Sequence, residues 1–267
     1  MNSQQLFDLS GRVAIVTGAA KGIGMGIAQN LASVGCSVAI ADLDSIEAEN
    51  VASEIRSKGD QAIAVSTDVS DQTSVENLCS QTMSSFGHID ILVNNAAVYP
   101  MSPISEMTMD LWDHVLNVNL RGAFLMIRQL APEIIKAGSK GRIINISSIN
   151  TGKSYVGMPH YDSSKGGLEA LTRSCALEYA EHGVTANVIA PGAVKTPGSM
   201  TVRGNLAKER GDPTTAEVDA EFASRIPLGD WATPDMIGQA TTLLATPAAS
   251  YITGQTIYVD GGLKLTI

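Results

Sequence analysis

The sequence is poor in aromatic residues and in cysteine. Only 4% of its 267 residues are Phe, Trp or Tyr, so we expect a core built from aliphatic side chains. Its three cysteines, Cys36, Cys79 and Cys175, are odd in number and lack CxxC spacing. This pattern indicates neither a disulfide framework nor a zinc site, and we expect three small buried thiols.

Positive charge is also scarce. The chain has 18 Lys and Arg against 27 Asp and Glu, a net charge of −9. A protein that binds by neutralising a phosphate backbone needs the opposite balance, so we expect no nucleic-acid partner. No cluster of His, Asp and Glu has metal-ligand spacing, and we expect no catalytic metal.

Long hydrophobic runs are missing as well. No stretch of 18 apolar residues occurs, and the first residues, Met1 to Arg12, contain no apolar segment of signal-peptide length. These observations predict a cytoplasmic protein with no membrane span. No Pro-rich or Ser-rich linker and no break in composition divides the chain, so we expect one domain over residues 1–267.

Short apolar, β-branched runs are present at regular intervals and predict seven strands. Segments of helical length lie between them, such as 23–34, 46–58 and 75–86. Strands without a polar face that alternate with helices indicate a parallel sheet covered on both sides. The predicted strands are Val13–Val16, Val38–Ala41, Ala62–Val65, Ile89–Val93, Ile143–Ile146, Thr185–Ile189 and Thr256–Val259.

This α/β pattern fits both a doubly wound sheet and an eight-stranded barrel, and the turn after the first predicted strand decides between them. The turn reads Thr17-Gly18-Ala19-Ala20-Lys21-Gly22-Ile23-Gly24. Its glycines allow close backbone approach, and the helix that follows offers free N–H groups and a positive dipole end to a pyrophosphate. We therefore predict a Rossmann-type doubly wound sheet that binds a dinucleotide.

Asp42, at the end of the second predicted strand, strengthens this interpretation. A carboxylate there can accept hydrogen bonds from a ribose diol and would repel a 2′-phosphate, which favours NAD over NADP. Lys21 favours the opposite choice unless it is a solvated loop lysine. Asp44 is either a second acceptor or a helix cap, and we interpret it as the cap.

Tyr161 and Lys165 are four residues apart in a segment, His160 to Tyr179, that has a helical apolar pattern, so they share one helix face. A phenol must lose roughly 2 pKa units, about 2.7 kcal/mol, to act as a base near neutral pH. An ammonium about 5 Å away supplies roughly 3 kcal/mol at an effective dielectric near 20. We therefore expect Lys165 to lower the pKa of Tyr161, although the same pair also occurs on ordinary helices.

The chain from about Leu9 to Gly262 resembles the short-chain dehydrogenase/reductase family. TGAAKGIG (17–24) is similar to the family's TGxxxGxG motif, NNAA (94–97) to NNAG with an alanine in the last place, and PGAVKT (191–196) to PGxxxT. The closing segment YVDGG (258–262) resembles the family's last strand and turn. The resemblance implies oxidoreductase activity, a nicotinamide cofactor and a homotetramer.

The same resemblance implies site residues. The catalytic residues would be Asn119, Ser148, Tyr161 and Lys165, with Ser147 as a support for Ser148 and Asn117 as structural. The cofactor-binding residues, from the turn, from Asp42 and from these motifs, would be Gly18, Lys21, Gly22, Ile23, Gly24, Asp42, Leu43, Asp68, Val69, Asn95, Ala96, Ala97, Tyr161, Lys165, Pro191, Gly192, Val194 and Thr196.

The mechanism implied is hydride transfer between nicotinamide and a secondary alcohol or ketone. Tyr161 would exchange the hydroxyl proton, Ser148 would bind the reacting oxygen, and Asn119 would hold a water behind Lys165. The alternatives are an NADPH-dependent 3-oxoacyl-carrier-protein reductase, which Asp42 and the net charge oppose, and a non-catalytic dinucleotide sensor, which the intact tetrad opposes.

The substrate is the least determined part of this interpretation. Ser148, Asn150, Tyr155 and Tyr161 are the substrate-binding residues that we predict, and a polyol or sugar is the small-molecule class that polar side chains favour. Further candidates for the lining are Tyr99, Pro100, Met101, Lys153, His160 and Met200. The charged segment 197–227 has no strand signal and predicts a lid, with a helix over Thr215–Ser224 that Thr214 would cap.

Overall fold

Seven parallel strands form one sheet in the computed structural model, which describes residues 2–201 and 215–266. The strand order is β3-β2-β1-β4-β5-β6-β7, so the order reverses between β1 and β4. This is the doubly wound arrangement that the glycine turn predicts, and not a barrel. The strands are β1 (Val13–Thr17), β2 (Ser37–Asp42), β3 (Ala62–Ser66), β4 (Ile91–Asn94), β5 (Arg142–Ile146), β6 (Thr185–Pro191) and β7 (Thr256–Val259).

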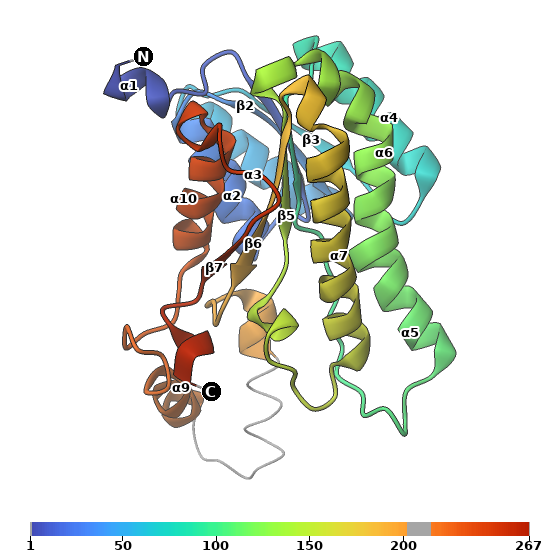
Figure 1. Ribbon diagram of the computed structural model, residues 1–267, viewed down its shortest axis with the longest axis vertical. Helices are drawn as coiled ribbons and strands as arrows, with labels where there is room; N and C mark the ends of the chain where they lie inside the picture. The colour runs from blue at the N-terminus through green and yellow to red at the C-terminus, as the bar shows by residue number, and fades with distance from the viewer. Residues whose placement is uncertain (1, 202–214, 267) are drawn as a thin grey trace.

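Helices cover both faces of the sheet (Figure 1). The helices α2 (Gly22–Ser33), α3 (Ser45–Ser57) and α10 (Pro234–Ala245) pack on one face. The helices α4 (Gln72–Phe86), α6 (Gly122–Lys136) and α7 (Pro159–Glu178) pack on the other. The remaining helical segments are α1 (Ser3–Leu6), α5 (Met109–Leu116), α9 (Thr215–Ala223), η1 (Asn117–Arg121), η2 (Gly138–Lys140), η3 (Ile149–Thr151), η4 (Ala180–His182), η5 (Pro247–Ala249) and η6 (Leu263–Thr266).

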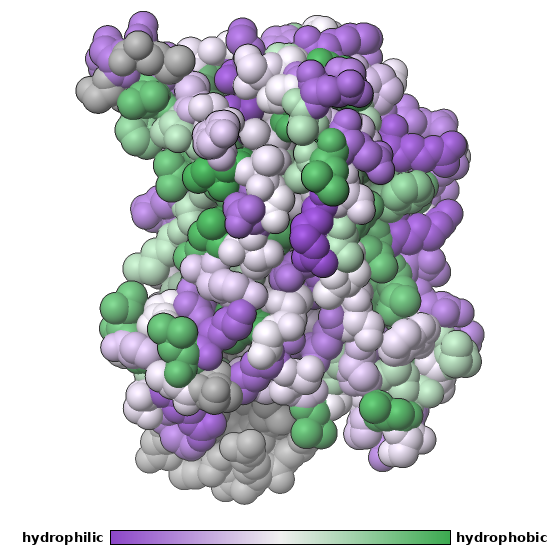
Figure 2. Space-filling model, in the orientation of Figure 1, coloured by the Kyte–Doolittle hydropathy of each residue, from purple (hydrophilic) through white to green (hydrophobic). Residues whose placement is uncertain are grey.

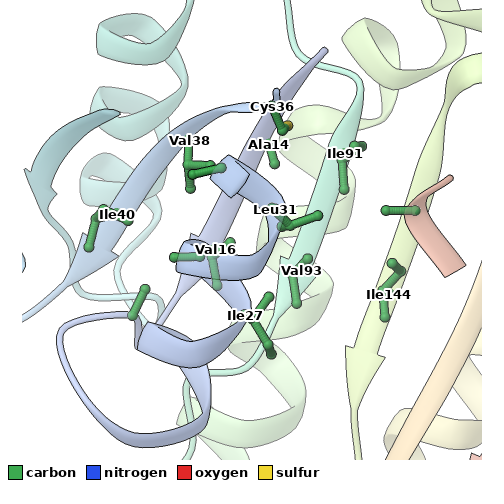
Figure 3. Packing of buried hydrophobic residues seen from close by; sticks show 14 of the residues in the cluster. Ala14, Val16, Ile27, Leu31, Cys36, Val38, Ile40, Ile91, Val93 and Ile144 are labelled. Atoms are coloured by element: carbon green, nitrogen blue, oxygen red, sulfur yellow. The ribbon is translucent and has the colours of Figure 1, made fainter. Parts of the chain in front are cut away.

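Each central strand contributes side chains to two apolar layers. In β1, Ala14 and Val16 belong to the layer under α2, whereas Ile15 belongs to the layer under α4, α6 and α7. Figure 3 shows the first layer, where Ile27 and Leu31 of α2 lie against the strands. Because both faces of the strand are buried, the positions from Val13 to Val16 are all apolar, and such a run is visible in the sequence.

Local sequence fixes the ends of several helices. Asp44 caps α3 by accepting a hydrogen bond from the Glu47 backbone N–H, as we predicted. Asp71 caps α4 in the same way, and Gly87 ends it with a φ of 83° that favours glycine. The predicted strand and helix bounds differ from the observed ones by one to two residues at most ends, and the strand expected at Ile89 begins at Ile91.

The segment predicted as a lid is described only in part. A helical turn begins at Pro197 and reaches the last described residue before the gap, Thr201. On the other side of the gap, α9 coincides with the predicted helix, whereas its expected cap, Thr214, lies outside the described residues.

The cysteines form no disulfide, but they are not equally buried. Cys36 and Cys175 are buried, whereas Cys79 on α4 is only partly covered, which corrects the expectation of three buried thiols. Within the described residues, no helix has the length and apolar character needed to cross a membrane.

Candidate active site

A cavity of about 700 Å³ opens at the carboxyl ends of the strands, across the point where the strand order reverses. Ligands of open α/β sheets bind in this position, because adjacent loops diverge there. The cavity has one end beside the glycine turn and Asp42 and another beside Ser148 and Tyr161.

The glycine turn has the conformation that a phosphate cradle requires. Gly18 and Gly22 have φ values of 62° and 58°, which disfavour any other residue. A Cβ on Gly24 would lie 2.2 Å from the carbonyl oxygen of Gly18, so the helix approaches the turn closely. Lys21 precedes α2 without a side-chain cap, which leaves the first N–H groups of the helix open to a ligand. The turn therefore fits a pyrophosphate.

Asp42 lines the cavity beyond this turn. Its carboxylate accepts hydrogen bonds from the backbone N–H groups of Ala20, at 2.9 Å, and Asp44, at 3.0 Å. Each oxygen keeps a lone pair with which it can accept a ribose hydroxyl. Lys21 and Leu43 lie beside it and are exposed.

Asn95 connects the turn to the next strand. Its side-chain amide donates to the carbonyl oxygens of Thr17, at 2.8 Å, and Gly18, at 2.9 Å. Ala97, which replaces the glycine expected from the family motif, does not have a positive φ, so its methyl group causes no backbone strain. Asp68 is occupied locally, since it accepts two hydrogen bonds from Ser70.

The segment after β6 closes the cavity from the opposite side. Val194 pairs with Ala232, and the hydroxyl of Thr196 accepts a hydrogen bond from the Ser199 N–H at 3.1 Å. A Cβ on Gly22 would lie 3.4 Å from the Thr196 side chain, so the two sides of the cavity meet at this point.

The structure brings nearly all of the predicted cofactor-binding residues to this cavity, and only Gly24 lies beneath the surface of the turn. The residues that line the cavity are Gly18, Lys21, Gly22, Ile23, Asp42, Leu43, Asp68, Val69, Asn95, Ala96, Ala97, Tyr161, Lys165, Pro191, Gly192, Val194 and Thr196.

Tyr161, Lys165 and Ser148 lie together at the other end of the cavity. Lys165 is 2% exposed, and its Nζ lies 5.6 Å from the centre of the Tyr161 ring. The Tyr161 ring packs edge-on against Tyr99, with 6.0 Å between ring centres. Ser147 points elsewhere, since its hydroxyl donates to Glu169, so Ser148 is the serine that faces Tyr161.

The pKa values differ from the expectation that Lys165 lowers the pKa of Tyr161. Burial raises the pKa of Tyr161 to about 12, against a smaller lowering by the Ser148 hydroxyl. Burial lowers the pKa of Lys165 to about 8. The charge attraction that we counted from the sequence is smaller than the cost of removing both groups from water.

Asn119 lies behind these groups, in the π-helical segment η1 that joins α5 to α6. Its side chain makes a pair of hydrogen bonds with the backbone of Val98, at 2.8 and 2.9 Å. Its amide also donates to the hydroxyl of Ser164, next to Lys165. Asn119 is 1% exposed and is not among the described residues that line the cavity.

Besides Ser148 and Tyr161, four of the predicted substrate contacts line the cavity, namely Tyr99, Met101, Asn150 and Tyr155. His160 does not, because it is fully buried one residue before Tyr161, where the helix has turned by about 100°. Lys153 instead lies over the ring of Tyr155, at 5.0 Å from its centre. Pro100 and Met200 are exposed and are likewise absent from the described part of the wall.

Other residues of the wall were not predicted from the sequence. Phe222 of α9 stacks on Trp231, with 4.6 Å between ring centres, and both line the cavity. Trp231 is one of only two tryptophans in a chain poor in aromatic residues. This rarity is the one feature of the sequence that could have indicated a role for it. Other lining residues that were not predicted include His114, Ile149, Met158 and Leu263. The described residues include no group of three or more His, Cys, Asp or Glu placed to hold a metal ion.

Comparisons with known proteins agree with this geometry. A family model described as enoyl-(acyl carrier protein) reductase matches residues 18–264. A short chain dehydrogenase/reductase of Aspergillus oryzae is 37% identical over 266 residues, 98% of each chain. Galactitol 2-dehydrogenase of Agrobacterium fabrum is 37% identical over 254 residues, 95% of this chain and 98% of that protein.

A solved structure leads to the same result. The crystal structure of a dehydrogenase/reductase from Sinorhizobium meliloti has a TM-score of 0.86 and 32% identity, over 97% of this chain and 98% of that one. The match in sequence extends over the whole fold, and the motifs lie around one cavity. This chain belongs to the short-chain dehydrogenase/reductase family of oxidoreductases.

Proposed function

We propose that this protein is an NAD-dependent dehydrogenase that oxidises a secondary alcohol of a polyol or sugar, or reduces the corresponding ketone. The observation that carries the proposal is the shared cavity, which has the glycine turn and Asp42 at one end and Ser148, Tyr161 and Lys165 at the other. A bound NAD would place its pyrophosphate at the turn and its nicotinamide beside Tyr161. The nicotinamide, when bound, accepts or supplies the hydride.

The residues of the chain supply the rest of the chemistry. Tyr161 exchanges the proton of the alcohol oxygen as general base or acid. Ser148 makes a hydrogen bond to the same oxygen, and Lys165 binds the nicotinamide ribose from the buried side of Tyr161. Asn119 stabilises the backbone at Val98 and, by family resemblance, holds the water of a proton relay behind Lys165.

The choice of NAD over NADP rests on Asp42. Its carboxylate lines the cavity at the end of β2 and keeps lone pairs for the adenosine ribose diol, and a 2′-phosphate there would meet a negative charge. Lys21 is exposed nearby and acts in the opposite direction. We assign the preference to Asp42, because two backbone hydrogen bonds hold it in place, whereas the side chain of Lys21 extends into solvent.

The proposed substrate class rests on a relative and on the wall of the cavity. The galactitol 2-dehydrogenase to which this chain is similar acts, by its name, on a polyol. The cavity wall carries the hydroxyls of Ser148 and Tyr155 and the rings of Tyr99 and Trp231. Hydroxyls and C–H faces of a sugar-like molecule fit hydrogen-bonding groups and rings of this kind.

We also propose that the enzyme is a homotetramer. Besides the family resemblance, large apolar side chains are exposed on β7 and α10, such as Ile257 at 37%, Met236 at 51% and Leu243 at 45%, and on α6, where Phe124 is 46% exposed. Figure 2 shows hydrophobic residues at the surface over α10 and along the outer helices. Mass measurement in solution tests the tetramer. A cytoplasmic location stays a prediction, which cell fractionation can check.

One competing function has a specific observation in its favour. The matching family model is described as enoyl-(acyl carrier protein) reductase, which also names a carrier-protein substrate. A carrier protein is acidic, and docking it on a chain of net charge −9 would be electrostatically unfavourable. A 3-oxoacyl-carrier-protein reductase of this family would also use NADPH, which Asp42 disfavours. A dinucleotide sensor without turnover is the third possibility.

A single assay separates these functions. The absorbance of reduced nicotinamide is followed with purified protein, NAD and NADP in separate reactions, and polyols, sugars, sugar acids, hydroxy acids and simple secondary alcohols as substrates. Turnover of a polyol or sugar with NAD supports the proposal. Turnover of a 3-oxoacyl thioester with NADPH, or tight NADH binding with no turnover of any alcohol, contradicts it.

A further inference from the structure

Asn150 lies between the proposed catalytic serine and a carboxylate that the mechanism above does not use. The hydroxyl of Ser148 donates to the Asn150 side-chain oxygen at 3.1 Å. The Asn150 side-chain nitrogen donates to Oδ1 of Asp162 at 2.8 Å. Asn150 is 8% exposed, so few solvent molecules compete for these bonds. Ser148, Asn150 and Asp162 thus form a chain of hydrogen bonds that ends beside Tyr161.

The chemistry of the carboxylate fixes the direction of every bond in this chain. An ionised carboxylate can only accept hydrogen bonds, so the nitrogen of the Asn150 amide must face Asp162. The amide oxygen must then face Ser148, and an amide oxygen also only accepts. The Ser148 hydroxyl is therefore the donor of its bond to Asn150. The backbone N–H of Asn150 donates to the same hydroxyl oxygen at 3.2 Å, which holds it further in place.

We propose that Asn150 and Asp162 are positioning residues, which hold the hydroxyl proton of Ser148 on Asn150 while Tyr161 is protonated and so fix the place of the Ser148 oxygen in the cavity. The proposal rests on the dehydrogenase function proposed above. It assigns Asn150 a role that acts through Ser148 and not through contact with the substrate.

The arrangement has a consequence for Tyr161. While Tyr161 is protonated, Ser148 keeps its proton on Asn150. When Tyr161 ionises, the tyrosinate and the Asn150 oxygen compete for that one proton. The groups whose charges act on Tyr161 from its surroundings are Tyr99 and Asp162, both of which raise its pKa, and the ammonium of Lys165 lies at 5.6 Å from its ring. A Ser148 proton released from Asn150 would stabilise the tyrosinate and lower the pKa of Tyr161.

Three variants test the chain of bonds. Asn150→Ala removes the acceptor but keeps the charge of Asp162. Asp162→Asn removes the charge and allows the side-chain amide of Asn150 to rotate, so that its nitrogen can face Ser148. The exchange variant, which combines Asn150→Asp with Asp162→Asn, restores both the total charge and an acceptor that faces Ser148. Asp113→Asn on α5 and Ser163→Ala on α7 are controls of matched type at exposed positions outside the cavity.

The first readout is the ionisation of Tyr161 in the absence of substrate. It is measured by ultraviolet titration as the difference between each protein and the same protein with Tyr161→Phe. We expect the pKa of Tyr161 to fall by about one unit, a tenfold change in the equilibrium, in Asn150→Ala and Asp162→Asn. We expect it to return toward that of the wild type in the exchange variant, and to stay unchanged in both controls.

The second readout is the pH profile of alcohol oxidation. We expect the rise of kcat/KM with pH to move to lower pH in Asn150→Ala, with KM unchanged. An unshifted Tyr161 in Asn150→Ala would overturn the proposal, because a pure charge effect of Asp162 would persist in that variant. A higher KM with an unshifted pH profile would also overturn it, and would make Asn150 a substrate contact. Since the titration needs no substrate, it decides the positioning role even if no alcohol is oxidised, a result that would count against the proposed function alone.

Discussion

The ammonium nitrogen of Lys165 lies 5.6 Å from the centre of the Tyr161 ring and donates a 2.7 Å hydrogen bond to the carbonyl oxygen of Ile146. The two residues lie one turn apart on α7, so Lys165 lies on the same face of the helix as Tyr161, and its side chain is buried. Burial raises the pKa of Tyr161 to about 12 and lowers that of Lys165 to about 8. The protein alone therefore keeps Tyr161 as a neutral phenol at ordinary pH, and this resting state determines how the reaction depends on pH.

Alcohol oxidation is expected to accelerate with rising pH. Oxidation needs tyrosinate as the base, and below its pKa the tyrosinate fraction grows tenfold with each pH unit. Because the pKa of Tyr161 is raised, this increase should continue through the alkaline range, whereas ketone reduction, which needs the phenol, should not increase. The measurement is kcat/KM in both directions between about pH 7 and pH 10. Oxidation that is independent of pH across this range would contradict the raised pKa.

Replacing Tyr161 by Phe should remove turnover and leave cofactor binding intact. The phenylalanine keeps the ring that packs against Tyr99 and removes only the hydroxyl that we propose exchanges the proton. We expect kcat to fall by about 10³-fold, within the range for loss of a general acid or base. The control is NADH affinity, measured by fluorescence, which should match that of the wild type. A variant with near-normal turnover would show that another group transfers the proton.

Replacing Lys165 by Met should stabilise the fold at neutral pH while it removes activity. The pKa of Lys165 is lowered from 10.5 to about 8, so the folded chain carries a penalty for the buried ammonium that is complete below about pH 8. Removing the lysine should therefore add about 3 kcal/mol to the free energy of unfolding at neutral pH. The lost hydrogen bond to Ile146 reduces this gain by about 1 kcal/mol.

The sign of this effect should reverse at high pH. Above about pH 8 the folded chain has released the Lys165 proton, and the penalty of the wild type falls as the pH rises toward 10.5, the pKa of the lysine in the unfolded chain. At that pH only the lost hydrogen bond remains as a difference in the variant. Denaturant unfolding of both proteins at neutral and alkaline pH measures the crossover. A Lys165→Met protein that is less stable than the wild type at neutral pH would show that the lysine is not penalised by burial.

The fold was predictable because its signals are local. Strands buried on both faces must be apolar at every position, so runs such as 13–16 and 38–41 identify themselves. The π-helical turn at Asn119 was not predictable, because it depends on hydrogen bonds to Val98, a residue 21 positions away. The exact strand ends also depend on pairing with neighbours, as at β4.

The sequence predicted which residues gather at the cavity, but not their chemical state. The residues expected from the glycine turn, from the Tyr161–Lys165 spacing and from the family motifs lie around one cavity. Their pKa values were not predictable, because desolvation depends on the burial that tertiary packing creates. The direction in which a side chain on α7 points was not predictable either. His160 and Tyr161 are neighbours in sequence, but Tyr161 lines the cavity, whereas His160 is fully buried away from it.

Replacing Asp42 by Ser should weaken NAD and improve NADP. In the proposed site, the lost carboxylate would accept hydrogen bonds from the ribose diol and would repel a 2′-phosphate. Hydrogen bonds to a charged group contribute about 1.5–3 kcal/mol each, or roughly 10-fold to 100-fold in affinity. The readout is the ratio of kcat/KM with the two cofactors. Asp44→Ser is the matched control, because a serine can keep the cap of α3. If the substitution only made the turn at Ala20 collapse, binding of both NAD and NADP would weaken. A loss of selectivity requires that kcat/KM with NADP improves.

Two glycine-to-alanine changes should differ in their effect on NADH binding. A Cβ at Gly24 would lie 2.2 Å from the Gly18 carbonyl oxygen, so the phosphate turn must shift, whereas a Cβ at Gly166 on α7 meets nothing within 4 Å. We expect Gly24→Ala to raise the Kd of NADH by at least about tenfold, since a displaced turn loses its hydrogen bonds to the pyrophosphate. Gly166→Ala should leave that Kd unchanged and stabilise the fold by up to about 1 kcal/mol, because alanine favours the helix. Fluorescence titration with NADH and denaturant unfolding measure both effects, and equal NADH affinity in the two variants would mean that the close contact at Gly24 does not shape the cofactor site.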